Sequence, residues 1–259
     1  MRRALRGEHR VGAELRTRVG AARGPSAPAP AALAPKVVAA LPSLAPEERV
    51  VGLALYGLLA AGAPCTAEEL ASRSGLTAGR VGELLASLPT ATVEAGAVTG
   101  FLGLRVGEGR HRVRFLLRQG GEEGTELAAW CAWDALFIPS LVGLRAEVRS
   151  RCPSTGAPIS LEVDPHDGVV RASPEGVVLT FLTDPAPFCG DLVAGFCRWI
   201  HFFTGAEAAA RWSGGARARE RGGAPGIAVL SLADGIAVGR LTNEAIFGAA
   251  APTGAAPRG

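Results

Sequence analysis

Two cysteines in this sequence stand among aromatic residues, in surroundings that suit the chemistry of a soft metal. Cys131 lies in the segment Trp130–Asp134 and Cys197 in the segment Phe196–Phe203, and three of the 4 tryptophans fall in these segments. If the first segment is helical, Cys131 and Asp134 share one face. A thiol and a carboxyl side by side can bind a soft metal and deliver a proton to the group that it carries. A second thiol from Cys197 would complete a small, dry, sulfur-rich site.

A purely structural interpretation of each cysteine stays open, because free cysteines are among the most buried residues. Asp134 favours the chemical interpretation, since a carboxyl in an apolar run must be capped, paired or functional, and burial keeps it protonated. A zinc site fits less well, because no Cys-x-x-Cys pair exists and His111, His166 and His201 fall in no ligand pattern. The sequence also has no phosphate-binding loop and no dinucleotide-binding glycine pattern.

The elements that must position these residues divide into two regions, and the first, 36–112, predicts a winged-helix-like helical domain. A helix is expected over 47–61, a second after the capping box that Thr66 begins, and a third over 77–88. A hairpin over 93–104 follows, with a glycine in its turn. Three helices and a hairpin in this order are typical of a winged helix-turn-helix.

Nucleic acid is not the expected partner of this region. The third helix presents Arg80 beside Glu83 and little else that reads base edges, and the net charge of the whole chain is only +3. We therefore favour a structural or substrate-covering role over DNA binding.

The second region, 113–248, predicts a mixed α/β catalytic domain, so the fold class is α+β. The first cysteine segment is expected in a helix over 122–137 that Pro139 closes. Further strands are expected over 145–150, 159–163 and 177–181, and helices over 206–212 and 241–247. Residues 1–35, a basic Ala/Pro-rich extension, and 249–259, a low-complexity tail, are expected to be disordered.

Composition limits the class of protein. A chain of 259 residues with 48% hydrophobic residues has ample material for a core. It contains no apolar run long enough to span a membrane and no secretory signal, so a cytoplasmic location is expected. Its 5 cysteines are too few and odd in number for a disulfide framework, which favours reduced thiols. Among them, Cys65 is expected to be an ordinary buried thiol.

Three segments, in order, resemble the alkylmercury (organomercurial) lyase family. Ala129–Pro139 looks like the active-site helix of that family, and Arg151–Pro158 resembles the loop that follows it. Phe196–Phe203, with Trp212 after it, is similar to the second cysteine motif. The order and approximate spacing agree from Tyr56 to Phe247, and the family also has a winged-helix-like N-terminal domain.

The resemblance implies roles for individual residues. Cys131, Asp134 and Cys197 match the catalytic groups and would also hold the mercury of the substrate and product. The candidate pocket residues for the organic group are Trp130, Trp133 and Phe196, although packing against the core accounts for each equally well.

Three further positions bear on the resemblance. Cys152 matches a cysteine of the family that is structural. Arg198 stands where many members have a second cysteine, which bears on the release of the metal. Cys189 has no counterpart that we can place.

The implied reaction is protonolysis of a carbon–mercury bond, which gives a hydrocarbon and Hg(II) and serves mercury detoxification without an organic cofactor. The substrate would arrive as a thiol adduct, and Hg(II) would leave to low-molecular-weight thiols or to a mercuric reductase. Two alternatives remain at this point: a thiol-based, metal-sensing winged-helix transcriptional regulator, and a non-catalytic mercury-binding protein. The helix over 77–88 has few side chains that could read base edges, which argues against the regulator. The second needs thiols alone, so Asp134 argues against it.

Overall fold

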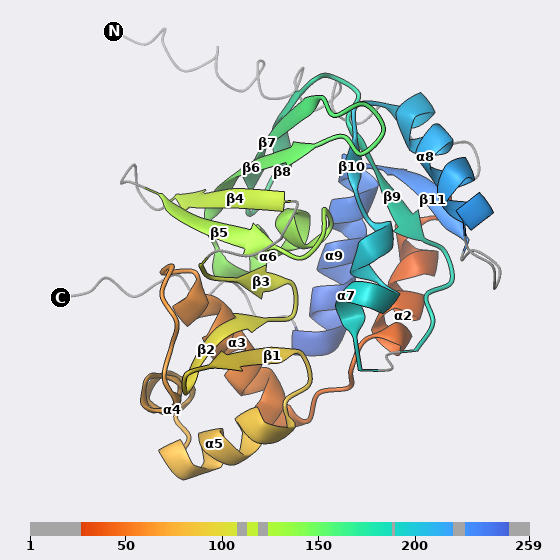
Figure 1. Ribbon diagram of the computed structural model, residues 1–259. Helices are drawn as coiled ribbons and strands as arrows, with labels where there is room; N and C mark the ends of the chain where they lie inside the picture. The colour runs from red at the N-terminus through yellow and green to blue at the C-terminus, as the bar shows by residue number, and fades with distance from the viewer. Residues whose placement is uncertain (1–26, 108–112, 119–123, 188–189, 220–225, 249–259) are drawn as a thin grey trace, which may run out of the picture.

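The computed structural model describes residues 27–107, 113–118, 124–187, 190–219 and 226–248 (Figure 1). Most of the predicted N-terminal extension, the whole C-terminal tail and Cys189 lie outside these ranges. The end of the extension is not disordered as predicted, because the first described helix, α2, already begins at Pro30. Proline is favoured at the first position of a helix, where its missing N–H has no partner to lose.

The chain begins with helices that carry clear local signals. Their bounds are α2 Pro30–Ala40, α3 Pro46–Leu59, α4 Ala67–Ser74 and α5 Ala78–Ser87. The Thr66 side chain accepts a hydrogen bond from the Glu69 N–H, and the Glu69 side chain accepts one from the Thr66 N–H, which is the capping box expected there. Thr77 caps α5 with a single hydrogen bond, accepted by its side chain from the Arg80 N–H, and the expected helices of this region are confirmed.

One antiparallel sheet forms the body of the molecule. Its strands follow the order β1-β2-β3-β5-β4-β6-β7-β8. Their bounds are β1 Ala91–Glu94, β2 Ala97–Phe101, β3 Leu104–Arg105, β4 Val113–Arg118, β5 Thr125–Ala129, β6 Arg145–Arg151, β7 Pro158–Asp164 and β8 Gly168–Ser173. The expected N-terminal hairpin is present as β1–β2, and its hydrogen bonds continue through β3 into β5. The sheet therefore runs across the division predicted at residue 112, and the two-domain boundaries stay predictions.

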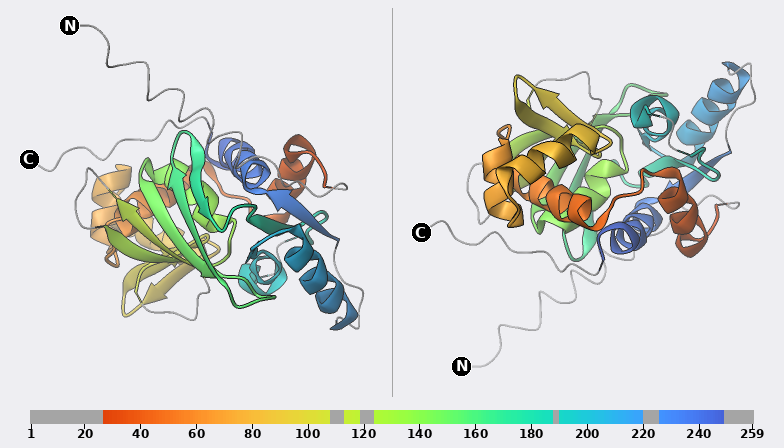
Figure 2. Two further views of the ribbon diagram at one scale, coloured as in Figure 1. Left: turned by 90° about the horizontal axis from the view of Figure 1, so that it is seen from above. Right: turned by 90° about the horizontal axis from the view of Figure 1, so that it is seen from below.

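A smaller sheet and the remaining helices complete the α+β fold. The elements are α6 Asp134–Val142, β9 Val178–Leu182, α7 Leu192–Gly195, the 3-10 helix η1 Cys197–Trp199, β10 Phe202–Phe203, α8 Ala206–Arg219, β11 Ile227–Ser231 and α9 Leu232–Phe247. The small sheet has the order β10-β9-β11. Helix α9 packs against both α2 and α6, and Figures 1 and 2 show α2 and α9, from opposite ends of the chain, side by side.

The predicted helix over 122–137 is wrong except at its end, since only 134–137 of its described residues are helical. Thr125–Ala129 is strand β5, which pairs with β3 and β4, so sheet hydrogen bonds override the helical appearance of the local sequence. Helix α6 begins only at Asp134. Pro139 does not close it, because a proline keeps a helical φ, and α6 ends at Gly143 in the left-handed conformation (φ 69°).

Two further predicted helices are longer than expected, since α8 extends to Arg219 and the predicted helix 241–247 is the end of α9. Within the described ranges, no helix is both long enough and apolar enough to cross a bilayer.

Candidate active site

The first part of the site is the turn between β5 and α6. The Trp130 N–H donates to the Gly103 carbonyl (3.0 Å), which ties the start of the turn to the β2–β3 connection. The Cys131 N–H donates to Asp134 Oδ2 (2.8 Å), so the carboxylate at the first residue of α6 reaches back over the turn. Cys131 and Asp134 therefore converge through a turn and a helix N-terminus, and not along one helical face as predicted.

The second part of the site is the 3-10 helix η1, which begins at Cys197. The Ala132 N–H donates to the Ile200 carbonyl (3.3 Å) and joins this segment to the first turn. From the buried strand β9, the Thr180 hydroxyl donates to the Trp199 carbonyl (2.7 Å). These two hydrogen bonds hold Cys197 against Cys131, 66 positions earlier in the sequence.

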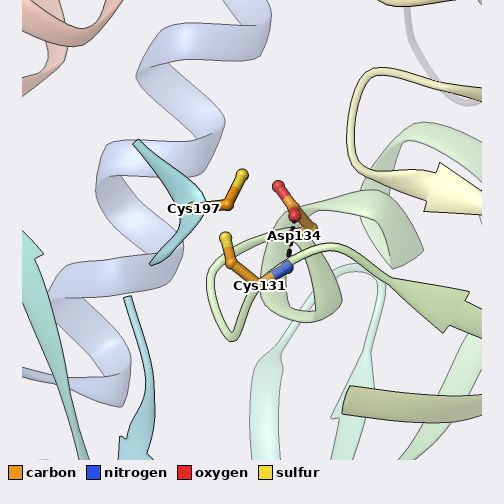
Figure 3. A group of neighbouring side chains, drawn as sticks. All are labelled: Cys131, Asp134 and Cys197. Atoms are coloured by element: carbon orange, nitrogen blue, oxygen red, sulfur yellow. Dashed lines mark hydrogen bonds between the residues drawn. The ribbon is translucent and has the colours of Figure 1, made fainter. Parts of the chain in front are cut away.

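The three candidate groups face one another in the interior (Figure 3). The ligand atoms of Cys131, Asp134 and Cys197 all lie within 4.8 Å of one another, and the residues are only 2%, 4% and 3% exposed. Sulfur and carboxylate oxygen atoms at this spacing can hold one metal ion between them, and two thiols select a soft one. The structure thus brings together all three residues that the sequence singled out.

A mostly apolar pocket of about 370 Å³, part of it open to solvent, leads to this cluster. Asp134 and Cys197 line it, whereas Cys131 is not among its lining residues. Of the three aromatic residues predicted to form a pocket, Trp133 and Phe196 line it, with ring centroids 5.9 Å apart. Trp130 is partly buried and packs against the core.

Comparisons with known proteins identify the family of this chain. The family model of MerB, alkylmercury lyase, matches residues 108–242. An alkylmercury lyase of Streptomyces lividans is 34% identical over 201 residues, which cover 77% of this chain and 85% of that protein. The alkylmercury lyase of Bacillus cereus is 34% identical over 72% of this chain and 78% of its own length. The chain belongs to the alkylmercury lyase family.

A solved structure agrees with this assignment at the level of the fold. The crystal structure of the mercury-bound form of MerB2 superposes with a TM-score of 0.61 at 23% identity, over 83% of this chain and 98% of that one. Family membership makes the chain an enzyme that cleaves carbon–mercury bonds, as predicted. It does not favour a metal-sensing regulator or a non-catalytic mercury-binding protein.

Burial raises the pKa of the acid and of both thiols in this cluster. It raises the pKa of Asp134 from 3.8 to about 6, although hydrogen bonds with the Cys131 thiol and N–H favour the carboxylate. Burial likewise raises the pKa of Cys131 well above its usual range, and the hydrogen bond with Cys197 and the Asp134 charge add to this. For Cys197 the hydrogen bond with Cys131 has the largest single effect and lowers the pKa, but burial and the charges of Asp134 and Asp191 together raise it. Both thiols are therefore protonated at neutral pH.

Three residues that shape the site escaped the sequence analysis. Gly103 lies against the Asp134 carboxyl: a Cβ at position 103 would stand 2.6 Å from Asp134 Cγ. Thr242 and Asn243, on α9, line the pocket. A left-handed glycine in a short turn is a recognisable signal for close backbone approach, but nothing in the local sequence of α9 indicates a pocket.

The remaining described cysteines lie apart from the cluster that holds Cys131 and Cys197, and all of the described cysteines are free thiols. Cys65 is buried beside β2, where its N–H and carbonyl pair with Val98. Cys152 begins the β6–β7 loop and accepts a hydrogen bond from the Thr204 hydroxyl at 3.7 Å. Burial alone would raise the pKa of Cys152, but hydrogen bonds from Thr155, Thr204 and the loop backbone lower it to about 7.

Proposed function

We propose that this enzyme cleaves the carbon–mercury bond by protonolysis, with Cys131 and Cys197 as mercury ligands and Asp134 as the proton donor. The observation that carries the proposal is the convergence of these three buried groups within 4.8 Å. Mercury is a soft metal that prefers thiolate ligands, so two thiols supply its binding site. A carboxyl whose pKa is raised to about 6 exchanges protons readily near neutral pH.

The reaction must account for two thiol protons. In the first step, a thiol of the enzyme replaces the carrier thiol on R–Hg–SR′, and its proton leaves on R′SH. In the second step, the other thiol passes its proton to the Asp134 carboxylate and binds mercury as a thiolate. Asp134 then protonates the carbon as the Hg–C bond breaks, which gives R–H, bis-thiolate Hg(II) and the original carboxylate. Holding the acid beside the carbon removes much of the entropic barrier of this protonolysis in water.

Hg(II) then leaves to low-molecular-weight thiols or to a mercuric reductase. Both fates exchange one thiolate for another, which suits a site whose two cysteines are free. The reaction needs reduced cysteines throughout, and for this reason we place it in the cytoplasm, where thiols are kept reduced.

The N-terminal region acts as a winged-helix-like cover for the substrate. The order α3-α4-α5-β1-β2 supports this, and so does the Tyr56 hydroxyl of α3, which donates to the Leu102 carbonyl (2.6 Å) beside Asp134. Arg80 of α5 supports no DNA contact, because its guanidinium pairs with Glu47 (2.7 Å) and Glu83 (2.8 Å).

The test is headspace detection of benzene from phenylmercury in the presence of excess thiol. Wild type is expected to release benzene. The Asp134→Asn variant is expected to bind phenylmercury but to release no benzene, because the amide keeps the shape of the carboxyl but has no acidic proton. Cys65→Ser, which alters a buried thiol away from the site, is the matched control and should keep wild-type turnover. Benzene from Asp134→Asn at the wild-type rate would remove Asp134 as the donor. Mercury binding by wild type without benzene would refute the lyase mechanism.

A further inference from the structure

Two polar groups on α9 lie buried without hydrogen bonds. Thr242 Oγ1 and Asn243 Nδ2 have no partner among the described residues, and Thr242 is only 2% exposed. A threonine inside a helix commonly returns its hydroxyl to the carbonyl one turn earlier, but Thr242 does not. Buried polar groups in proteins are almost always paired, so such atoms call for a partner outside the chain.

Both residues line the pocket that leads to Asp134 and Cys197. In Figure 3, α9 runs along the Cys197 side of the cluster. Apart from Thr242, Asn243, Asp134 and Cys197, the side chains that line the pocket are apolar. The pair on α9 is therefore a small polar area on an otherwise apolar wall, close to where the mercurial must bind.

We propose that Thr242 and Asn243 form a subsite that binds a neutral, hydrogen-bond-accepting oxygen of the mercurial substrate. Asn243 Nδ2 can only donate, and the Thr242 hydroxyl can donate beside it, so the ligand atom must accept. Among the described residues, no lysine, arginine or histidine lines the pocket, and Asp134 already occupies it, so a carboxylate would lie unpaired beside a second acid. An ether, alcohol or carbonyl oxygen fits, carried either by the organic group or by the carrier thiol. The proposal of this subsite depends on the proposed function, because that function identifies the ligand as a mercurial.

The experiment uses two pairs of substrates that differ by one oxygen in place of one methylene. The first pair, 3-methoxyphenylmercury and 3-ethylphenylmercury with the same thiol, places the oxygen on the organic group. The second pair, phenylmercury carried by 2-methoxyethanethiol or by butanethiol, places it on the carrier. Affinity is measured by calorimetry, on Asp134→Asn protein for the first pair and, for the second, on Asp134→Asn protein that also carries Cys131→Ser and Cys197→Ser and cannot displace the carrier thiol. Hydrocarbon release is measured on wild type. In one of the pairs, the oxygen-bearing compound is expected to bind about 2- to 10-fold more tightly, the effect of one neutral hydrogen bond.

Thr242→Val and Asn243→Leu, each combined with Asp134→Asn, should reduce that preference, because they keep the volume and remove the donor. Ser213→Ala is the matched control, since it removes another buried unpartnered hydroxyl, one that does not line the pocket, and should leave the preference intact. No preference in either pair overturns the subsite, and so does a preference that both α9 substitutions leave unchanged. Absence of hydrocarbon from wild type would instead refute the lyase mechanism, while calorimetry would still decide the subsite.

Discussion

Replacing Gly103 with alanine tests how the fold positions Asp134, the proposed proton donor. Gly103 lies in the β2–β3 turn with φ +94°, and a Cβ there would stand 2.6 Å from Asp134 Cγ and 2.7 Å from Asp134 Oδ1. Ordinary contacts of a Cβ lie at 3.4–4 Å. The carboxyl in the Gly103→Ala variant must therefore move by about 1 Å, or the turn must open by as much.

The displacement predicts a large kinetic effect. A misplacement of about 1 Å in a catalytic group can reduce the rate about 100-fold. The left-handed backbone adds a separate cost of about 1–2 kcal/mol in stability, since alanine has a Cβ that glycine lacks. Turnover and stability thus report two different consequences of the same substitution.

Gly96→Ala separates these consequences. Gly96 has φ +83° in the neighbouring β1–β2 turn, and a Cβ added there would meet no atom of the described residues within 4 Å. Both variants should unfold at lower urea concentration than wild type, but only Gly103→Ala should release benzene from phenylmercury about 100-fold more slowly, through kcat. The pH dependence of benzene release by Gly103→Ala should also differ from that of wild type, because moving the carboxyl alters the burial that sets the pKa of Asp134.

Equal turnover in the two variants would refute the reasoning. It would mean that Asp134 tolerates a shift of its carboxyl, or that the turn relaxes away from it without effect on the chemistry. A loss of turnover by both variants, in proportion to their loss of stability, would mean that strain in the sheet and not contact with Asp134 is responsible.

Four other substitutions have distinct expected outcomes. Cys131→Ser and Cys197→Ser should each abolish benzene release while the far-UV circular dichroism stays that of wild type. Asp134→Asn should raise stability at pH 8 by up to about 3 kcal/mol but not at pH 4, as measured by urea unfolding, because the raised pKa of Asp134 means that folding favours its protonated form. In wild type, that contribution is fully present below about pH 4 and is lost as the pH rises through about 6. Cys152→Ser should lower Tm without lowering turnover, since Cys152 organises the β6–β7 loop.

A different result for any of these variants would contradict the role proposed for that residue. Benzene release by either serine variant at the active site would remove that thiol as an essential mercury ligand. A stability of Asp134→Asn that parallels wild type from pH 4 to pH 8 would show that the carboxyl titrates as in the unfolded chain. A Cys152→Ser protein that is stable but inactive would place Cys152 in the reaction.

Helices and turns that carry local sequence signals were predictable, whereas strands that form only by pairing with distant strands were not. The capping box at Thr66 and the hairpin turn at Gly96 are decided within a few residues, and the structure has both. Thr125–Ala129 has no such signal, because it becomes a strand only through hydrogen bonds to β3 and β4. The helix predicted there was wrong for the same reason.

The site shows the same contrast. The short spacing between Cys131 and Asp134 correctly indicated proximity, although a turn and not a helical face produces it. Cys197 reaches the site through the Ala132–Ile200 hydrogen bond, a long-range contact that its aromatic surroundings and the family resemblance suggested but that no local signal specifies. Thr242 is ordinary in sequence, and its polar atom becomes unusual only when α9 is packed against the pocket.

Burial sets the protonation states of Cys131, Cys197 and Asp134, and these states suit the proposed reaction. The raised pKa values of Cys131 and Cys197 keep both thiols neutral before substrate binds, so the folded protein carries no unpaired thiolate in this buried site. Mercury reverses this preference, because a metal-bound thiol loses its proton. In the proposed reaction two protons are displaced: one leaves with the carrier thiol, and the other needs a nearby acceptor whose pKa lies close to neutral. The pKa of Asp134, about 6, suits it to that proposed role, and the same burial that makes the carboxylate costly to the fold would favour return of the proton to carbon.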